Sequence, residues 1–213
     1  MHIPDGFISP KVYIPAYVVT AGLWAYGFKK LKDVLDERTL PFVAVMTAFS
    51  FVVSLFTVPL PGGTSGHAVG VGLLSVAFGY WVAFVSLSVV FFLQAVLFGD
   101  GGITTFPINA FSMGFVGGVV AHYSYRLFGK INDRFGLFVA GWLSVVVASL
   151  VVAVILGIQP VIAHTPEGKP LFFPFGIEIT LPAVVVPHLI VGIVEGIMTV
   201  IGIQVYRRLK VEG

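Results

Sequence analysis

The first two residues place three nitrogen atoms within reach of a single metal ion. These donors are the α-amine of Met1, the peptide nitrogen between Met1 and His2, and Nδ1 of the His2 ring. The amine and amide nitrogens close a five-membered chelate ring, and the amide nitrogen and Nδ1 close a six-membered ring, so the donors lie nearly in one plane. A planar set of nitrogen donors is typical of Ni(II) or Cu(II), because square coordination suits their d-electron counts.

One in-plane position stays open, and His67 is the natural fourth donor. His67 ends the segment PLPGGTSGH, residues 59–67, and begins an apolar stretch. The segment PDGF, residues 4–7, favours a turn that folds the first residues back toward the helices. The alternatives are a frayed, solvated histidine at position 2 and a capping histidine at position 67. The metal hypothesis is favoured because both residues are expected on the same membrane face.

Four polar residues are candidates for orienting the ligand histidines by hydrogen bonding. They are expected at the outer ends of the fourth and fifth spans: Gln94, Asp100, Asn109 and Ser112. The alternative is helix capping and turn formation by GDGG, residues 99–102. For Asp100 both interpretations stay open, whereas Asn109, inside an apolar stretch, is expected to support the ligands.

Further ionisable residues lie in the second half of the chain. His188 and Glu195 are seven residues apart on one helical face, about 10 Å along the axis, which is too far for obvious co-ligands. Glu195 is expected near the middle of the bilayer, where an ionisable group is a candidate for function. A hydrogen-bonded carboxyl that locks helix packing is the favoured alternative. We expect His122 at the membrane interface and His164 in a solvated loop.

The chain that positions these residues has the composition of an integral membrane protein. The chain has 213 residues, of which 57% are hydrophobic and 10% charged, whereas soluble domains have about 25% charged residues. The chain has no cysteine, which excludes disulfides and thiolate ligands. The first ten residues lack a basic region followed by an apolar core, so Met1 is expected to be the mature terminus. No G-x-x-x-x-G-K-[ST] motif is present, so ATP hydrolysis is expected to reside in another chain.

The apolar runs predict a single membrane domain of seven transmembrane helices. Residues 1–11 form the external metal-binding segment, residues 12–206 the bundle and residues 207–213 a cytoplasmic tail. The expected spans are 12–28, 40–58, two helices within 67–98 that divide near Gly79-Tyr80-Trp81, 107–128, 136–158 and 182–206.

The basic residues predict the orientation of this bundle. All of the 12 Lys and Arg residues except Lys11 and Lys169 fall in three segments on one predicted face. The positive-inside rule therefore places the N-terminus outside and the C-terminus in the cytoplasm. The expected location is the prokaryotic plasma membrane.

Four segments carry a resemblance to a known family. They are MHIPDGF at the N-terminus, SGHAVG at 65–70, LQAVLFGDGGITTFPINAFSMG at 93–114 and PHLIVGIVEG at 187–196. Over essentially the whole chain, the sequence resembles the substrate-specific (S) membrane component of cobalt and nickel energy-coupling factor transporters, the CbiM/NikM family.

The resemblance implies a seven-helix S component that captures a divalent metal ion outside the cell. The implied ligands are the Met1 amine, the amide nitrogen and Nδ1 of His2, and a ring nitrogen of His67. The implied partners are a transmembrane coupling (T) protein, a pair of cytoplasmic ATPases and a separate small membrane subunit. The implied mechanism is reorientation of the loaded component within the membrane.

Two choices stay open at the level of the sequence. Ni²⁺ is the leading substrate and Co²⁺ the alternative, because amide-nitrogen ligation in a plane suits Ni(II) better. The competing classes are a membrane metalloenzyme that uses His188, Glu195 and His122, and a passive divalent-metal channel.

Overall fold

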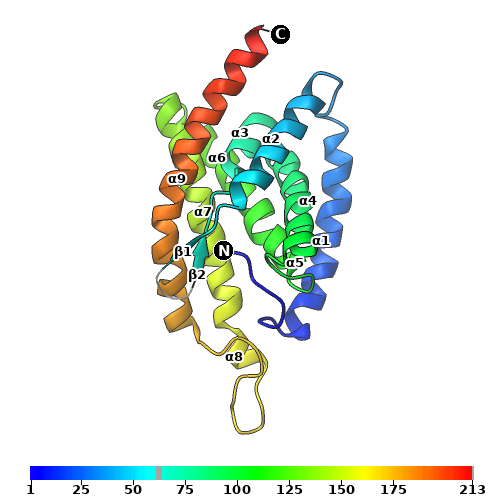
Figure 1. Ribbon diagram of the computed structural model, residues 1–213, viewed down its shortest axis with the longest axis vertical. Coiled ribbons are helices and arrows are strands. Elements are labelled where there is room, and N and C mark those ends of the chain that lie inside the picture. The colour runs from blue at the N-terminus through cyan, green and yellow to red at the C-terminus, as the bar shows by residue number, and fades with distance from the viewer. Residues whose placement is uncertain (61–63, 213) are drawn as a thin grey trace.

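The computed structural model describes residues 1–60 and 64–212, and it shows helices running along the long axis of the molecule (Figure 1). The first half of the chain contains α1 (Pro10–Leu31), α2 (Thr39–Ser54), α3 (Val71–Phe78) and α4 (Tyr80–Phe98). The second half contains α5 (Phe106–Asn109), the π-helix η1 (Ala110–Val116), α6 (Gly117–Phe128), α7 (Asp133–Gly157), α8 (Gln159–Ile162) and α9 (Ile177–Glu212).

The helices lie where the apolar runs predict them. The expected division between α3 and α4 occurs at Gly79, whose φ of +91° suits a residue without a Cβ. Within the described residues, three helical stretches are long and apolar enough to cross a membrane: Tyr80–Phe98, Asp133–Ile162 and Ile177–Val211. The structure therefore supports a helical membrane protein, while the seven crossings remain a prediction.

Two local features depart from the expected pattern. The segment before His67 contains a short antiparallel hairpin, β1 (Val58–Leu60) and β2 (Thr64–Gly66), in place of a plain loop. The helical rod from Phe106 to Phe128 passes through the π-helical turns of η1, and such turns occur frequently at functional sites.

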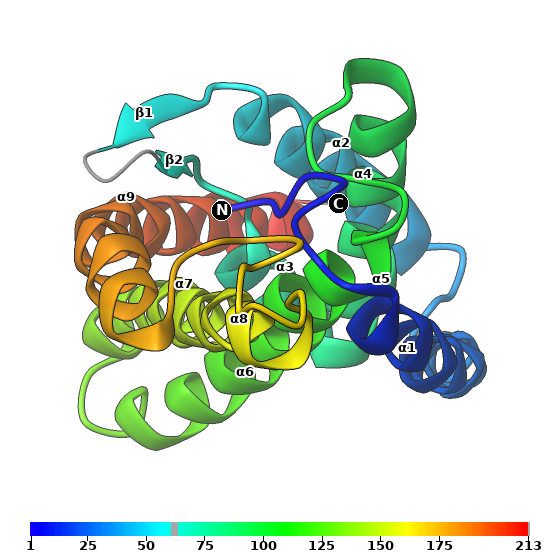
Figure 2. The ribbon, with the colours of Figure 1, turned by 90° about the horizontal axis from the view of Figure 1, so that it is seen from below.

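The N-terminal segment is part of the core. Figure 2 shows residues before α1 running across the end of the bundle toward its centre. Met1, Ile3 and Ile8 are only 7%, 1% and 1% exposed, and they belong to the same hydrophobic cluster as Leu74 and Phe84. The expected alternative of a frayed N-terminus is therefore not observed.

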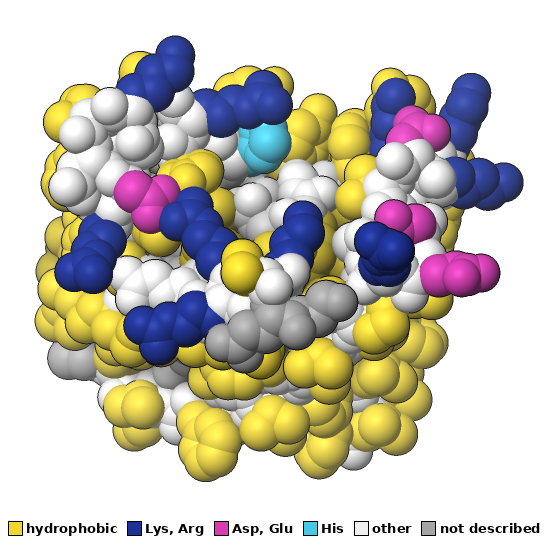
Figure 3. Space-filling view, turned by 90° about the horizontal axis from the view of Figure 1, so that it is seen from above, with side chains coloured by type: hydrophobic (Ala, Val, Ile, Leu, Met, Phe, Trp, Pro, Cys, Tyr) yellow, Lys and Arg dark blue, Asp and Glu magenta, His cyan; other side chains and the backbone are white. Residues whose placement is uncertain are grey.

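The opposite end of the molecule is basic. Lys and Arg side chains gather over this face in Figure 3. Arg207 of α9 donates to Asp133 of α7 at 2.6 and 3.0 Å and to the Tyr125 hydroxyl of α6 at 2.7 Å. This network joins three helices at the basic end.

Candidate metal centre

Hydrogen bonds hold the start of the chain inside the bundle. The Met1 amine donates to the Ser65 carbonyl at 2.7 Å, which ties it to β2. The Ile3 backbone donates to Oδ1 of Asn109 at 2.9 Å and accepts from Nδ2 of the same residue at 3.1 Å. Thr105 also donates to the Ile3 carbonyl. His2, between the two anchored residues, has little freedom to move.

The turn that follows is fixed to the loop between α4 and α5. The Asp5 carboxylate accepts from the Thr104 backbone at 2.8 Å, from the Thr104 hydroxyl and from the Ile103 backbone at 3.1 Å. Burial alone would raise the pKa of this carboxyl, but these hydrogen bonds outweigh it and lower the pKa below its usual value. Gly6 has a φ of +86°, which permits the tight reversal. Ser9 then donates its backbone N–H to Gln159 at 2.9 Å.

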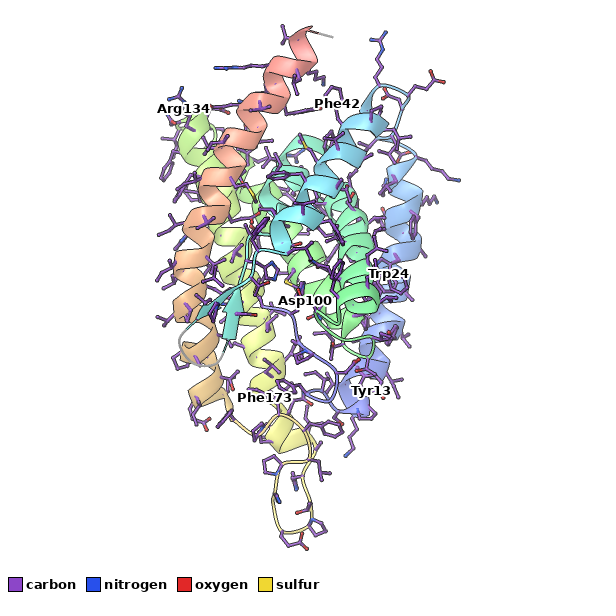
Figure 4. All side chains as sticks on the ribbon, viewed as in Figure 1. Tyr13, Trp24, Phe42, Asp100, Arg134 and Phe173 are labelled. Atoms are coloured by element: carbon purple, nitrogen blue, oxygen red, sulfur yellow. The ribbon has the colours of Figure 1, made fainter. Side chains whose placement is uncertain are left out.

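His2, His67 and Asp100 meet at the inner end of this segment. One ligand atom from each lies within 4.8 Å of the others. The two imidazole centroids are 4.7 Å apart with the ring planes inclined by 39°. Nδ1 of His2 is 3.0 Å from Oδ2 of Asp100, and the two side chains are 3% and 34% exposed. Figure 4 shows Asp100 at about the middle of the molecule, close to the N-terminal segment.

The nitrogen atoms of this group are suited to receive a metal ion. Nδ1 of His67 faces the Ala68 carbonyl at 3.2 Å, so Nδ1 carries the proton and Nε2 keeps a lone pair. Among the described residues, His67 Nε2 and both ring nitrogens of His2 are buried without a hydrogen-bond partner. Nδ1 of His2 has a charged neighbour in Asp100, 3.0 Å away, so the Nε2 atoms of the two histidines are the ring nitrogens left without a polar partner. Buried polar atoms normally have partners, so these orphaned nitrogens indicate a ligand site.

Burial also favours the unprotonated forms that bind metals. It lowers the pKa of the Met1 amine to about 5 and lowers the pKa of both imidazoles below their ordinary value. For His67, the nearby His2 and the amine lower the pKa further. At neutral pH the three groups are therefore neutral donors, as metal coordination requires.

Glu195 of α9 holds the segment that carries His67. Its Oε2 accepts from the backbone N–H groups of Val69 at 2.8 Å and Gly70 at 3.2 Å, and its Oε1 accepts from Gly72 at 3.2 Å. This is the hydrogen-bonded carboxyl that the sequence favoured. The sequence did not show that its partners follow directly after His67, because 126 residues separate Glu195 from Val69.

The expected hydrogen bonds from polar residues to the histidines are largely replaced by other contacts. Gln94 donates to Ser54 at 2.6 Å, and Ser112 donates to a carbonyl one turn earlier in its own helix at 2.7 Å. Asn109 is engaged with the Ile3 backbone and thus supports His2 through its neighbour. Only Asp100, of these four residues, is in contact with a candidate ligand histidine.

The remaining histidines lie apart from this group. His122 packs against the Tyr80 and Tyr123 rings, and His164 is an exposed loop residue whose Nδ1 faces the Thr165 carbonyl at 2.9 Å. His188 is buried in α9 and lines a cavity beside Met1. Among the described residues, His2, His67 and Asp100 are the one group of three or more potential ligands close enough to share an ion.

An apolar helical bundle that holds such a group of nitrogen donors is characteristic of a membrane protein that handles transition-metal ions. Comparison with known proteins gives the family. The model of the family "Cobalt uptake substrate-specific transmembrane region" (CbiM) matches residues 2–212, and the chain belongs to this family. Its members and relatives are described as metal transport proteins, not enzymes.

Individual relatives agree with this assignment. The chain is 39% identical over 212 residues to a probable fused nickel transport protein, LarMN, of Lactiplantibacillus plantarum, covering 98% of the chain and 65% of that protein. It is 40% identical over 206 residues to the fused nickel transport protein NikMN of Rhodobacter capsulatus, covering 93% and 59%. The chain thus spans about three fifths to two thirds of these relatives. A crystal structure of a truncated transition metal transporter matches with a TM-score of 0.91 at 38% identity, over 99% of both chains.

Proposed function

We propose that this chain is the substrate-binding S component of an energy-coupling factor importer and that it captures Ni²⁺, or alternatively Co²⁺, from outside the cell. The ligands are the Met1 amine, the amide nitrogen and Nδ1 of His2, and Nε2 of His67. The observation that carries the proposal is the burial of the free N-terminus beside His67, with unpartnered ring nitrogens on both histidines.

Binding by this donor set requires two local exchanges, and the His2 amide must lose its proton to water as its nitrogen binds the ion. The Met1 amine must release the Ser65 carbonyl, and Nδ1 of His2 must separate from Asp100. Both exchanges involve single contacts, whereas the hydrogen bonds of Ile3 and Asp5 can persist. The anchored segment therefore keeps the donors near their binding positions before the ion arrives.

The choice of Ni²⁺ rests on the donor set. Planar nitrogen coordination favours Ni(II) over ions that prefer oxygen ligands or tetrahedral sites. The two fused relatives are named as nickel transport proteins, and other relatives are named as cobalt transport proteins. Co²⁺ therefore stays the second candidate.

The remaining transporter functions are assigned to partners. We propose a transmembrane coupling protein, a cytoplasmic ATPase pair and a separate small membrane subunit. The description of two relatives as fused transport proteins supports an assembly of this kind. The basic face in Figure 3 supports a cytoplasmic C-terminal end and an N-terminus outside the plasma membrane.

Blocking the N-terminal amine tests the donor set directly. Acetylation of Met1, or a long N-terminal tag, should abolish tight Ni²⁺ binding in a titration followed by visible absorption. His67→Ala should leave a three-nitrogen fragment with much weaker binding. His122→Ala, which changes a histidine far from the group, is the matched control. Full affinity after acetylation would refute the proposed ligands.

The length of the N-terminal extension matters in this experiment. One added residue would create X-Met-His, whose amine, two amides and imidazole form a four-nitrogen site without His67. Ni²⁺ binding by such a protein would report on this new site and not on the site that includes His67. A passive channel is tested separately, since it predicts Ni²⁺ uptake into vesicles that contain this chain without the ATPases.

A further inference from the structure

Asp100 carries a negative charge that no lysine or arginine among the described residues balances. Its side chain is 34% exposed and lines a cavity of about 650 Å³, whose wall also includes Met1 and His2. Within the described part of the chain, the one basic side chain at ion-pairing distance from the carboxylate is His2, whose Nδ1 is 3.0 Å away. Lys and Arg side chains gather instead at the basic end of the molecule (Figure 3). The carboxylate therefore faces the candidate metal centre without a permanent cation.

The loop that carries Asp100 is packed against the N-terminal segment. Gly101 has a φ of +81°, and a Cβ at this position would lie 3.5 Å from Cβ of His2. At Gly102, a Cβ would collide with the backbone nitrogen of Asp5, so glycine permits this close approach. Rotation of the Asp100 side chain can release Nδ1 of His2 while the backbone of the loop stays in place. The carboxylate then remains beside the ion.

The proposed donor set leaves one positive charge at the loaded site. The Met1 amine and the two imidazole nitrogens are neutral donors, and the amide nitrogen of His2 carries one negative charge once its proton is lost. A divalent ion brings two positive charges, so one remains. Met1 and His67 are only 7% and 5% exposed, and an uncompensated charge in such surroundings is strongly unfavourable. One carboxylate beside the ion brings the sum to zero.

We propose that Asp100 is the counter-ion of the bound metal and not one of its ligands. This proposal rests on the function proposed above. A metal–nitrogen bond is about 2 Å long, so an ion on Nδ1 of His2 lies within about 5 Å of the present position of Oδ2 of Asp100. At this distance, in a site largely closed to water, opposite charges attract strongly. The nitrogens hold the ion, and the carboxylate cancels the charge that they leave.

A counter-ion and a ligand differ in their effect on the absorption spectrum. The d-electron energies of Ni(II) depend on the atoms bound to it and on their geometry. Removal of a counter-ion weakens binding but leaves the four nitrogens in place, so the spectrum of the fully loaded protein is unchanged. Removal of a carboxylate ligand would change the affinity and the spectrum together.

Three substitutions at Asp100 test the proposal on the full chain. Asp100→Asn keeps the shape and removes the charge, Asp100→Ala also removes any group that could bond to Nδ1 of His2, and Asp100→Glu keeps the charge. Titration with Ni²⁺ should give a Kd about ten- to a hundredfold weaker for the first two and within about threefold of wild type for the third. The loaded spectrum should be the same in all of them. Glu37→Gln, which removes an exposed carboxylate between α1 and α2, is the control and should bind like wild type.

The melting temperature separates charge compensation from a structural role. The empty site holds no cation for Asp100 to balance, so Asp100→Asn should leave the melting temperature of the metal-free protein within about 2 °C of wild type. The rise in melting temperature on adding Ni²⁺ at a fixed concentration should be smaller than in wild type, because this rise follows the affinity. A lower melting temperature of the metal-free variant would make Asp100 a structural residue and contradict the proposal.

Four other results would overturn the proposal. Wild-type Kd in both Asp100→Asn and Asp100→Ala would show that the charge is not needed. Weak binding in Asp100→Asn alone would indicate that the new amide group occupies Nδ1 of His2. Binding by Asp100→Glu as weak as that of Asp100→Asn would exclude the charge as the cause, and an altered loaded spectrum would make Asp100 a ligand. Failure of the proposed donor set is distinguishable, because it appears as full affinity of the Met1-acetylated protein whatever the Asp100 variants do.

Discussion

At the scale of single residues, Asp5 shows how the N-terminal segment is held at the site. Its carboxylate accepts three hydrogen bonds from Ile103 and Thr104, across about one hundred positions of sequence. These bonds favour the ionised carboxylate, which explains why the pKa of Asp5 is lowered despite the opposing effect of burial. The ionised form of this side chain therefore stabilises the docked segment.

The lowered pKa gives a direction for the pH dependence of stability. A carboxyl whose folded-state pKa is depressed contributes stability above its unfolded pKa, near 4, and loses it as the pH falls through the folded value. We expect Asp5→Asn to lower the melting temperature of the metal-free protein at pH 7 by about 2–4 °C. The difference from wild type should shrink as the pH falls below about 4. Glu37→Gln, at an exposed position between α1 and α2, is the control; an equal difference at pH 7 and pH 3 would contradict this role of Asp5.

The residues of the site differ in how far the sequence reveals them. The chelate formed by the Met1 amine, the His2 amide nitrogen and the His2 imidazole depends only on covalent connectivity, so it can be predicted without knowledge of the fold. The contact of Asp100 with His2 depends on the path of the loop after α4. Asn109 could be predicted to matter because it is polar in an apolar run, but its partner, the Ile3 backbone, could not be predicted.

At the scale of elements, α9 controls the position of α3 and of the histidine before it. Glu195 places two carboxylate oxygens against three backbone N–H groups at the start of α3. A helix N-terminus has unpaired N–H groups and a partial positive charge, both of which an acidic side chain satisfies. The carboxylate thus fixes the segment that carries His67 without being one of the proposed ligands.

Glu195→Gln tests this arrangement with the smallest change of shape. The amide keeps one accepting oxygen, but its NH₂ group would face backbone N–H donors, so at least one buried donor would lose its partner. We expect a loss of about 1–3 kcal/mol in the free energy of unfolding and a weaker affinity for Ni²⁺. Denaturation and metal titration of the same preparation measure both effects.

The control for this substitution lies in the same helix. Glu178 is exposed in the first turn of α9, so Glu178→Gln makes the same substitution without removing these hydrogen bonds. It should leave stability and Ni²⁺ affinity unchanged. Wild-type affinity in Glu195→Gln would mean that His67 is positioned by other contacts.

The elements also show which parts of the fold can be predicted from sequence patterns and which cannot. Long apolar runs are sufficient to place α1, α2, α4, α7 and α9, because a membrane helix must be apolar over about 20 residues. The division at Gly79 could be predicted from a glycine followed by aromatic residues. The π-helical turns of η1 and the β1–β2 hairpin carry no such signature, since both depend on what packs against them.

At the scale of the whole molecule, the two ends of the bundle have different structures. Hydrogen bonds from Arg207 join α6, α7 and α9 at the basic end. The loop between α8 and α9 lies at the opposite end, and the docked N-terminal segment and the β1–β2 hairpin lie between the two ends (Figure 1). The basic residues at one end, away from the candidate metal centre, agree with an orientation in which the basic face meets the cytoplasm.

The absence of cysteine from the chain allows this orientation to be measured. We expect a single cysteine at Glu167, in the exposed loop between α8 and α9, to react with a membrane-impermeant maleimide added to intact cells. A single cysteine at Lys130, between α6 and α7, should react only after the cells are permeabilised. The reverse pattern of labelling would contradict the proposed topology.

The inward-turned N-terminus has a consequence for the order in which this protein is made. Three of the hydrogen-bonding partners of that segment, Ser65, Asn109 and Gln159, follow their bonded residues by 64, 106 and 150 positions. A nascent chain must therefore emerge from the ribosome through Phe173, which donates to the Phe7 carbonyl, before its opening residues find all of these contacts. Until then the α-amino group is accessible to the enzymes that trim or modify new polypeptides. Any cleavage or modification at this nitrogen therefore takes place before the bundle closes over it.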